Sequence, residues 1–284
     1  MRSIEHPGPV HPTRVDCVPA TVRTFDVELP SGVILLEGLA DTVRAQGSTS
    51  AVFSLREGTL SPMAFVMPAL SDSPEHVAYF SERFEANGAA RIESGSITYG
   101  LRDGAPSLHC HATWTESDGR RRSGHLLAAE SRVERPLRLE ASVIDGAAFQ
   151  VSPDAETNFN LLQVSVNARR SGGTNAFVVR VRPNQDLCLA LEGACAERNI
   201  QRGVIRGGVG SLIGAVFDDG RVVEPFVTEV FIRRGVIAPG ADGLPHAKVD
   251  VGLVAHTGEI AEGRLERGQN PVLITFELVI EVEA

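Results

Sequence analysis

The sequence predicts an α+β fold in which strands dominate. Its 284 residues are 43% hydrophobic and 22% charged, a composition and length that suit one large globular domain or two of about half that size. Most segments alternate apolar and polar residues, as half-buried strands do, and only a few have the periodicity of a helix. Strand-rich halves with few helices indicate a mostly antiparallel sheet packed with one or two helices.

Three segments have the pattern of a helix. The first runs over 33–46, with Ser31 as a candidate N-cap and a glycine at its end. The second runs over 187–198 behind Asp186, and the third over 73–88, where a Ser-Pro pair would begin the helix. The alternating segments "TFDVELP", "AFVVRVRP", "HAKVDVGLVA" and "PVLITFELVIEVE" predict half-buried strands.

The second half of the chain echoes the first. "LLEGLADTVRAQG" (35–47) is similar to "LALEGACAERNI" (189–200), and three glycine-containing segments follow in the same order in both halves. They align Gly58 with Gly210, Gly95 with Gly235, Gly119 with Gly258 and Gly124 with Gly263. The period is domain-sized, so we expect a tandem duplication, with domains at 20–166 and 176–284. Residues 167–175, rich in Ser and Gly, are the predicted linker.

The N-terminal residues 1–19 are rich in proline and polar residues, and we expect a flexible lead-in there. They lack the apolar stretch of a signal peptide, and no apolar run in the chain is long enough to cross a bilayer, so a cytoplasmic location is expected. The four cysteines show no CxxC spacing, which favours reduced thiols, and Cys110 is expected in the core.

Three of the eight histidines fall in the stretch "PSLHCHATWTESDGRRRSGHLL". His109 and His111 project from one face of a strand, and "ESDG" is a turn signal that makes 107–115 and 120–128 a β-hairpin. An odd-numbered loop would place His125 opposite His111, so that three imidazoles converge. Three histidines leave an open fourth position, as in catalytic zinc sites, although nickel, copper or iron would accept the same ligands. The alternative is histidines that decorate an exposed strand.

Other polar residues of this hairpin suit chemistry beside a metal ion. Glu116 and Glu130 could act as general base or orient an imidazole, and Arg121, on the face of His125, could grip an anionic substrate. For any single one of them, a solvated hairpin tip is the favoured explanation. In the second half, Gly207, Gly208 and Gly210 of "GGVGSL" form either an anion-binding nest or a tight turn that another backbone approaches closely.

The order of strand, helix, "GxGSL" turn, "SGxI" strand and "HxH…DG…GHL" resembles the PPC domain (plants and prokaryotes conserved, also written PCC). "LHCHATWTESDGRRRSGHLL" carries the resemblance in the first half and "IRGGVGSLIGA" in the second. The resemblance implies two tandem domains of α+β fold, homotrimers with clefts at subunit boundaries, and a label of candidate DNA-binding protein. The second half departs from the pattern, because Lys248, Asp250 and Arg264 stand where the first half has its histidines. We expect these three to form a salt-bridged substitute for the triad.

The charge balance bears on the partners. Net charge is −9, with 27 basic against 36 acidic residues, and the Arg-Gly-Arg-Pro core of an AT-hook is absent from the sequence. Duplex DNA is therefore an improbable partner. We expect a metal-binding protein, with zinc as the first choice, that binds or acts on a small anionic metabolite, for example as a metal-dependent hydrolase or lyase. The alternatives are a DNA-binding regulator and a ligand-sensing module.

Overall fold

The computed structural model describes residues 2–167 and 173–283. The first half holds β1 (Val15–Leu29), α1 (Leu35–Ala45), β2 (Ser50–Leu60), β3 (Ala64–Val66), β4 (Pro68–Leu70), β5 (Ala78–Phe80), β6 (Phe84–Glu85), β7 (Ala90–Arg102), β8 (Ala105–Thr115), β9 (Arg121–Leu126), the 3₁₀ turn η1 (Ala128–Glu130), β10 (Val133–Asp145), β11 (Ala147–Pro153) and β12 (Asn160–Val166). The second half holds β13 (Ala176–Val181), α2 (Leu187–Ala196), β14 (Gly203–Val216), β15 (Val222–Pro239), β16 (Pro245–Ala255), β17 (Ile260–Arg264) and β18 (Val272–Val282).

The strand order of the sheet repeats itself. The first half reads β1-β10-β2-β7-β8-β9 and the second reads β13-β18-β14-β15-β16-β17, each counted outward from the antiparallel pairing of β1 with β13. Each half also has one long helix, placed between its first two strands in the chain. The predicted α+β fold with two tandem, mostly antiparallel units is therefore confirmed.

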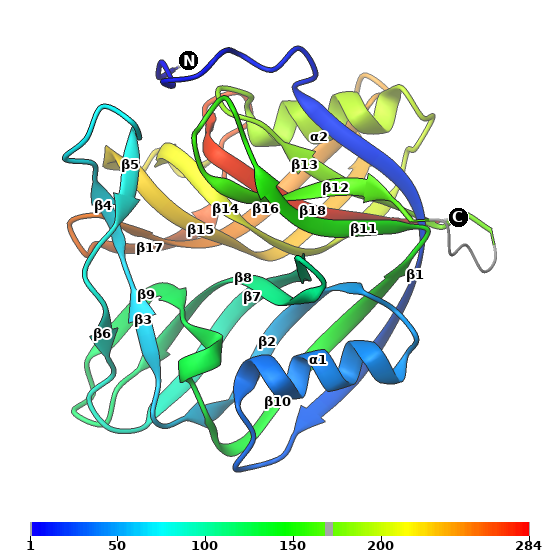
Figure 1. The fold of residues 1–284 in the computed structure, drawn as a ribbon. Helices are drawn as coiled ribbons and strands as arrows, with labels where there is room; N and C mark the ends of the chain where they lie inside the picture. The colour runs from blue at the N-terminus through cyan, green and yellow to red at the C-terminus, as the bar shows by residue number, and fades with distance from the viewer. Residues whose placement is uncertain (1, 168–172, 284) are drawn as a thin grey trace.

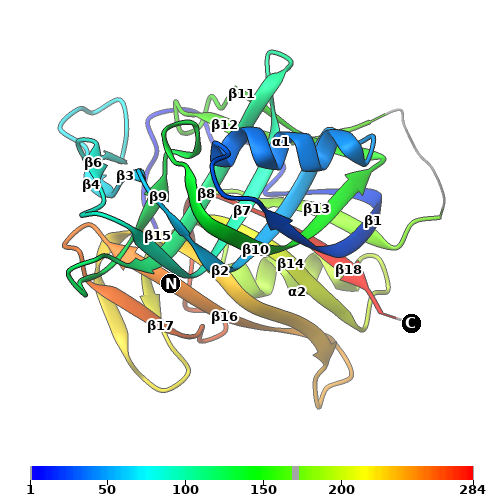
Figure 2. The ribbon, with the colours of Figure 1, turned by 90° about the horizontal axis from the view of Figure 1, so that it is seen from below.

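The two sheets stack as layers, with the helices on the outside (Figure 1). β1 belongs to both, because its first residues pair with β13 and its later ones with β10. Seen from below, α1 lies across the outer face of the first half (Figure 2). Each half buries its own apolar core, and a third cluster, which includes Val52, Phe149 and Val279, joins the halves. The helix-free faces of the two sheets therefore meet in the middle of the molecule.

Two helix predictions agree with the structure, with small differences at the ends. Asp186 caps α2 by accepting a hydrogen bond from the backbone N–H of Leu189. Ser31 does not cap α1; Ile34 occupies the cap position, and the N–H of Leu35 donates to the Ser131 carbonyl instead. A backbone partner distant in sequence thus replaces the local side-chain cap.

The third predicted helix, over 73–88, is wrong. Its residues form β5 and β6, which pair with β4 and β3. Apolar residues spaced three and four apart imitate a helical stripe there, but their side chains pack in other directions, so pairing distant in sequence overrides the local pattern.

The ends of the predicted domains fall as follows. Strand β1 begins at Val15, inside the segment expected as a lead-in, and upstream of it the ring of His6 is buried and bonds the carbonyl oxygen of Leu273 at 2.8 Å. Of the predicted linker 167–175, residues 168–172 lie outside the described part of the chain. No helix among the described residues is long and apolar enough to cross a membrane.

Candidate metal site between the two halves

Three histidines of the β8–β9 hairpin converge on one point. His111 lies directly opposite His125 in the strand pairing, and His109 precedes His111 on the same face of β8. Each residue offers one ring nitrogen such that the three nitrogens lie within 4.8 Å of one another. The five-residue loop between the strands has the odd length on which this pairing depends. Strand alternation and the turn therefore bring the three rings together as predicted.

The second half orients two of these rings. The Nδ1 atom of His111 lies 3.0 Å from the backbone carbonyl oxygen of Val230, and Nδ1 of His109 lies 2.8 Å from a carboxylate oxygen of Glu277. A carbonyl oxygen only accepts, so Nδ1 of His111 carries the proton, and the carboxylate selects the same tautomer for His109. The Nε2 atoms of both rings are left to face each other, 3.2 Å apart.

These nitrogens fit a divalent metal ion. With Zn–N distances of 2.0–2.1 Å, two ligands of a tetrahedral site lie about 3.3 Å apart, close to the separation of the two Nε2 atoms. Two lone pairs at that distance need a proton or a cation between them. The third ring supports the same interpretation, because Nδ1 of His125 is buried and has no hydrogen-bond partner. Partners that orient ligating imidazoles are typical of metal sites.

Burial keeps the site in the protonation state that metal binding requires. Burial lowers the pKa of His111 well below its usual value, and the charges of His109 and His125 lower it further. Burial, followed by the charge of His109, lowers the pKa of His125 to about 3. Both rings are therefore neutral imidazoles at neutral pH, with lone pairs ready for a cation.

A fourth buried residue, Glu229 of β15, stands beside the histidines. One carboxyl oxygen lies 3.8 Å from Nε2 of His111, and the other is buried without a partner. Burial raises the pKa of Glu229 well above its usual value, because it disfavours the charged carboxylate relative to the protonated carboxyl group. Its position suits either a metal ligand or a group that transfers a proton.

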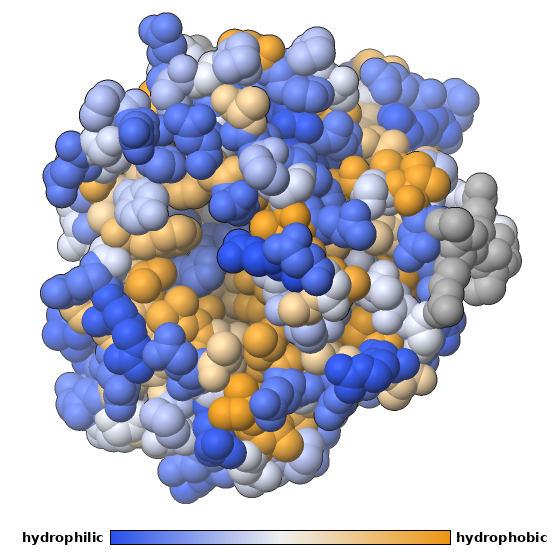
Figure 3. All heavy atoms as spheres, viewed as in Figure 1, coloured by the Kyte–Doolittle hydropathy of each residue, from blue (hydrophilic) through white to orange (hydrophobic). Residues whose placement is uncertain are grey.

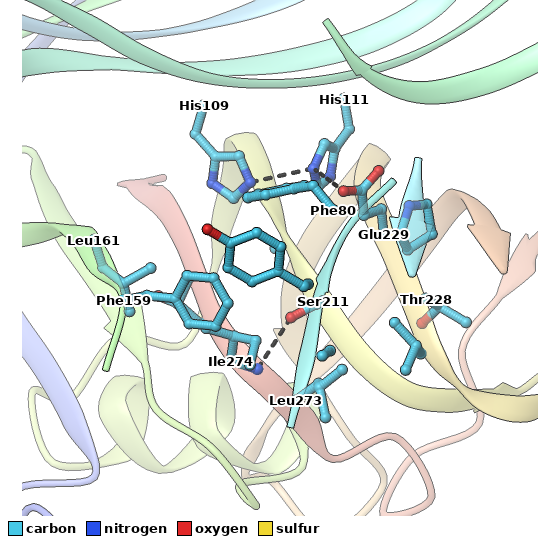
Figure 4. A pocket seen from close by; sticks show the side chains of 16 residues that line it. Phe80, His109, His111, Phe159, Leu161, Ser211, Thr228, Glu229, Leu273 and Ile274 are labelled. Carbon is cyan, nitrogen blue, oxygen red and sulfur yellow. Dashed lines mark hydrogen bonds and ion pairs between the residues drawn. The ribbon is translucent and has the colours of Figure 1, made fainter. Parts of the chain in front are cut away.

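A pocket of about 80 Å³ opens beside the triad. His109, His111 and Glu229 line one end, while Phe159, Leu161 and Ile274 are among the apolar residues farther along (Figure 4). The surface is hollowed between the two layers, next to the β4–β5 hairpin (Figure 3). The pocket draws its walls from both halves of the chain, so the duplication places the site at the junction of its two copies.

The predicted catalytic residues do not line this pocket. Glu116 closes the β8–β9 turn, where its side chain is buried 3.8 Å from Nε of Arg122. Arg121 bonds two carboxylates, Glu93 of β7 at 2.7 Å and Glu262 of β17. Glu130 bonds Arg83 at 2.6 Å on the surface. Arg121 thus forms an ion pair within its own half and another with the second half, so its guanidinium group already has two carboxylate partners.

The glycines of "GGVGSL" meet neighbouring chains closely. Gly207 and Gly208 have φ angles of 63° and 123°, and a Cβ atom at these positions would overlap Val52 and Ile232 respectively. Only Gly210 of the three lines the pocket, where a Cβ atom would overlap the backbone of β18. Glycine is therefore required at these positions because neighbouring strands approach the backbone of β14 closely. The pairing of β14 with β18 is shifted at these glycines, as in a β-bulge.

The second half holds an ion pair where the first half holds the triad. The β8–β9 and β16–β17 turns have matching hydrogen bonds, and Gly119 and Gly258 have φ angles of 84° and 86°. Asp250 accordingly lies opposite Arg264, as His111 lies opposite His125. The two charged groups bond at 2.9 Å on the surface. Lys248 has no ion-pair partner among the described residues, so the substitute is a pair rather than a trio.

The sequence interpretation missed Glu229 and Glu277. Both stand alone among apolar residues of a strand, in "FVTEVFI" and "LITFELVI". A lone carboxylate in a segment that otherwise reads as core is a signal for a buried partner, because an unpaired buried charge is costly. Here the partners are histidines from the other half of the chain.

The family comparison agrees with this architecture. Residues 18–139 match the family model of the Plants and Prokaryotes Conserved (PCC) domain. This part of the chain is therefore a PCC domain, as the sequence resemblance predicts. The second half repeats its strand order, so the chain is a tandem duplication of the fold. No curated protein is significantly similar in sequence to the chain.

Several solved structures are similar to about half of the chain. A plant- and prokaryote-conserved protein from Pyrococcus horikoshii is 18% identical, with a TM-score of 0.41 over 51% of this chain and 94% of its own. A metal-containing protein from Archaeoglobus fulgidus is 19% identical, with a TM-score of 0.43 over 51% and 97%. A candidate DNA-binding protein from Ralstonia eutropha is 19% identical, with a TM-score of 0.38 over 50% and 90%.

Proposed function

We propose that this protein binds one divalent metal ion, zinc as the first choice, through His109, His111 and His125, and uses it to bind or act on a small anionic molecule. The observation that carries the proposal is the pair of Nε2 atoms 3.2 Å apart, held in that arrangement by Glu277 and the Val230 carbonyl. Preorganised, desolvated lone pairs of this kind are costly unless a cation completes them.

The surrounding residues suit a metal-dependent hydrolase or lyase. A divalent ion here would polarise a carbonyl or carboxylate oxygen of the bound molecule. Glu229, with a free oxygen and a raised pKa, can give or take a proton at that end of the pocket. Glu277 fixes the His109 ring through the Nδ1 proton. The apolar walls of Val227 and Leu273 are buried and reduce the contact of the reacting groups with water.

Duplex DNA binding is the competing function, and the charges of the hairpin tip argue against it. Phosphate contacts need cations that are free to pair with them. Arg121 is held by two carboxylates, and Arg120 lies beside Asp118, whose pKa is lowered first by hydrogen bonds and also by the charge of Arg120. The basic run "GRRRSG" is therefore largely neutralised by neighbouring acids.

Metal analysis of tag-free protein tests the proposal. We expect about one equivalent of metal in the unmodified chain and none in His111→Ala. The matched control is His246→Ala, a half-buried histidine at another turn that bonds Asp242. Metal retained after His111→Ala, or lost equally in the control, would overturn the assignment. Fluorescence anisotropy with a labelled duplex at low salt tests the alternative: tight binding that His111→Ala leaves unchanged would favour the DNA-binding function.

A further inference from the structure

The roof of the pocket is a segment that only one half of the chain has. Residues 61–89 connect β2 to β7 in the first half, whereas residues 217–221 make the equivalent connection between β14 and β15. The insertion carries the β4–β5 hairpin, which forms a small sheet of its own. Its residues Tyr79 and Phe80 line the pocket opposite the second half. The half with the histidines is thus also the half with a roof above them.

Aromatic rings of this roof meet the triad and the opposite rim. The ring of Phe80 lies 5.3 Å from that of His125, and the ring of Tyr79 stacks on Phe159 at 5.9 Å. Phe159 comes from the loop between β11 and β12, so the contact closes the pocket across two distant segments. Tyr79 is nevertheless 52% exposed, which leaves the roof partly open to solvent.

The walls beyond the histidine end offer a ligand almost no polar group. Ser211 accepts a hydrogen bond from the Ile274 N–H (Figure 4), and Thr228 donates to the Leu212 carbonyl. Thr275 donates to Glu277. No lysine or arginine is among the residues that line the pocket in the described part of the chain. A charged group of a ligand would therefore find its partner only at the end formed by His109, His111 and Glu229, while the hydroxyls of Tyr79 and Ser211 are neutral polar groups beyond it.

We infer that the ligand is a small monocarboxylic acid with an apolar, preferably planar body. This inference rests on the proposed function, because the metal ion at the triad would hold the carboxylate. The body would then lie between the aromatic roof and the Leu273–Ile274 wall. A second charged group between the roof and the Leu273–Ile274 wall would lose hydration without gaining a charged partner. The inferred ligand class therefore excludes dicarboxylates, phosphate esters and sugar acids.

Three hydroxamate probes, each a stable metal-binding surrogate for a carboxylate, test the ligand class on the zinc-loaded protein by calorimetry. Acetohydroxamate carries a methyl group, benzohydroxamate an aromatic ring, and succinate monohydroxamate a second charge. Because burial of a ring is favourable, we expect benzohydroxamate to bind about tenfold to a hundredfold more tightly than acetohydroxamate. Succinate monohydroxamate should bind no more tightly than acetohydroxamate.

Variants of the aromatic residues test whether they cause the preference for benzohydroxamate over acetohydroxamate. Phe159→Ala and Tyr79→Ala should each reduce the ratio of the two affinities at least about threefold, with metal content and acetohydroxamate binding unchanged. Phe84→Ala is the matched control, an aromatic residue of the same insertion that does not line the pocket. Equal affinity for the methyl and phenyl probes in metal-replete protein would overturn the ligand class and leave the metal site intact. Protein that takes up no metal would instead overturn the proposed function.

Discussion

Replacing Glu277 by glutamine tests how the second half prepares the metal site. The carboxylate is almost fully buried, accepts the Nδ1 proton of His109 and also accepts a hydrogen bond from Thr275. A glutamine keeps the shape but has one acceptor and one donor. If its amide NH₂ faces His109, the ring must change tautomer and lose its Nε2 lone pair; if the oxygen faces His109, the ring keeps its lone pair but loses the negative charge that makes it a better ligand.

We therefore expect Glu277→Gln to weaken metal binding about tenfold to a hundredfold, which corresponds to about 1.4–2.7 kcal/mol, without abolishing it. Competition with a chromophoric chelator gives the dissociation constant, and a thermal melt of the metal-free protein checks the fold. The matched control is Glu281→Gln on the same strand, whose carboxylate bonds Arg206 at 2.7 Å, away from the triad. An unchanged affinity in Glu277→Gln, or an equal loss in the control, would refute the reasoning.

Three further outcomes are expected. Asp154→Asn should lower the free energy of unfolding by about 3–5 kcal/mol near pH 7, because Asp154 is the buried partner of Arg180 at 2.8 Å. Burial alone would raise the pKa of Asp154, but its hydrogen bond to Arg180 and that residue's charge hold it well below the usual value. This stabilisation is complete above about pH 4 and is lost as the pH falls further, so urea unfolding between pH 5 and 2 should show the difference between the two proteins shrinking. Gly210→Ala should cost about 1–3 kcal/mol in the same assay, because the methyl group would overlap the backbone of β18. Asp250→Ala should cost no more than about 1 kcal/mol, since its pair with Arg264 is solvent-exposed, and a larger loss would contradict a surface role for this pair.

Local patterns predicted the parts of this protein that local interactions decide. Two of the helices and the pairing of His111 with His125 depend on strand alternation and turn residues within one helix or hairpin, and the duplication is visible because such local patterns recur in the same order in both halves. The triad became visible because a strand and its turn partner lie close in the sequence. Structural features that depend on residues close in sequence can be predicted without knowing how the rest of the chain packs.

The errors concern contacts between distant segments. The failed helix over 73–88 is an insertion whose rings pack on Phe159, a residue far along the chain. Glu277 and Glu229 approach the histidines across the packed sheets; a lone carboxylate in an apolar strand signals a buried partner, but nothing in either segment identifies that partner as a histidine of the other half. Arg121, placed on the correct strand face by alternation, is neutralised by a residue of the other half. Local sequence therefore locates the ligands, while the stacking of the two halves decides which polar residues surround them.

The difference between the two hairpins has a physical basis in burial. His111 is 2% exposed and faces the other sheet, whereas the side chain of Asp250 is 30% exposed at the equivalent position. Charged residues remain hydrated at the exposed position, so an Asp–Arg pair costs little there. The same pair at the buried position would lose its hydration, while neutral imidazoles tolerate burial and gain partners from Glu277 and Val230. One copy of the duplication thus supplies the three histidines of the candidate metal site and the other supplies the groups that orient two of them, so neither copy alone contains the complete arrangement.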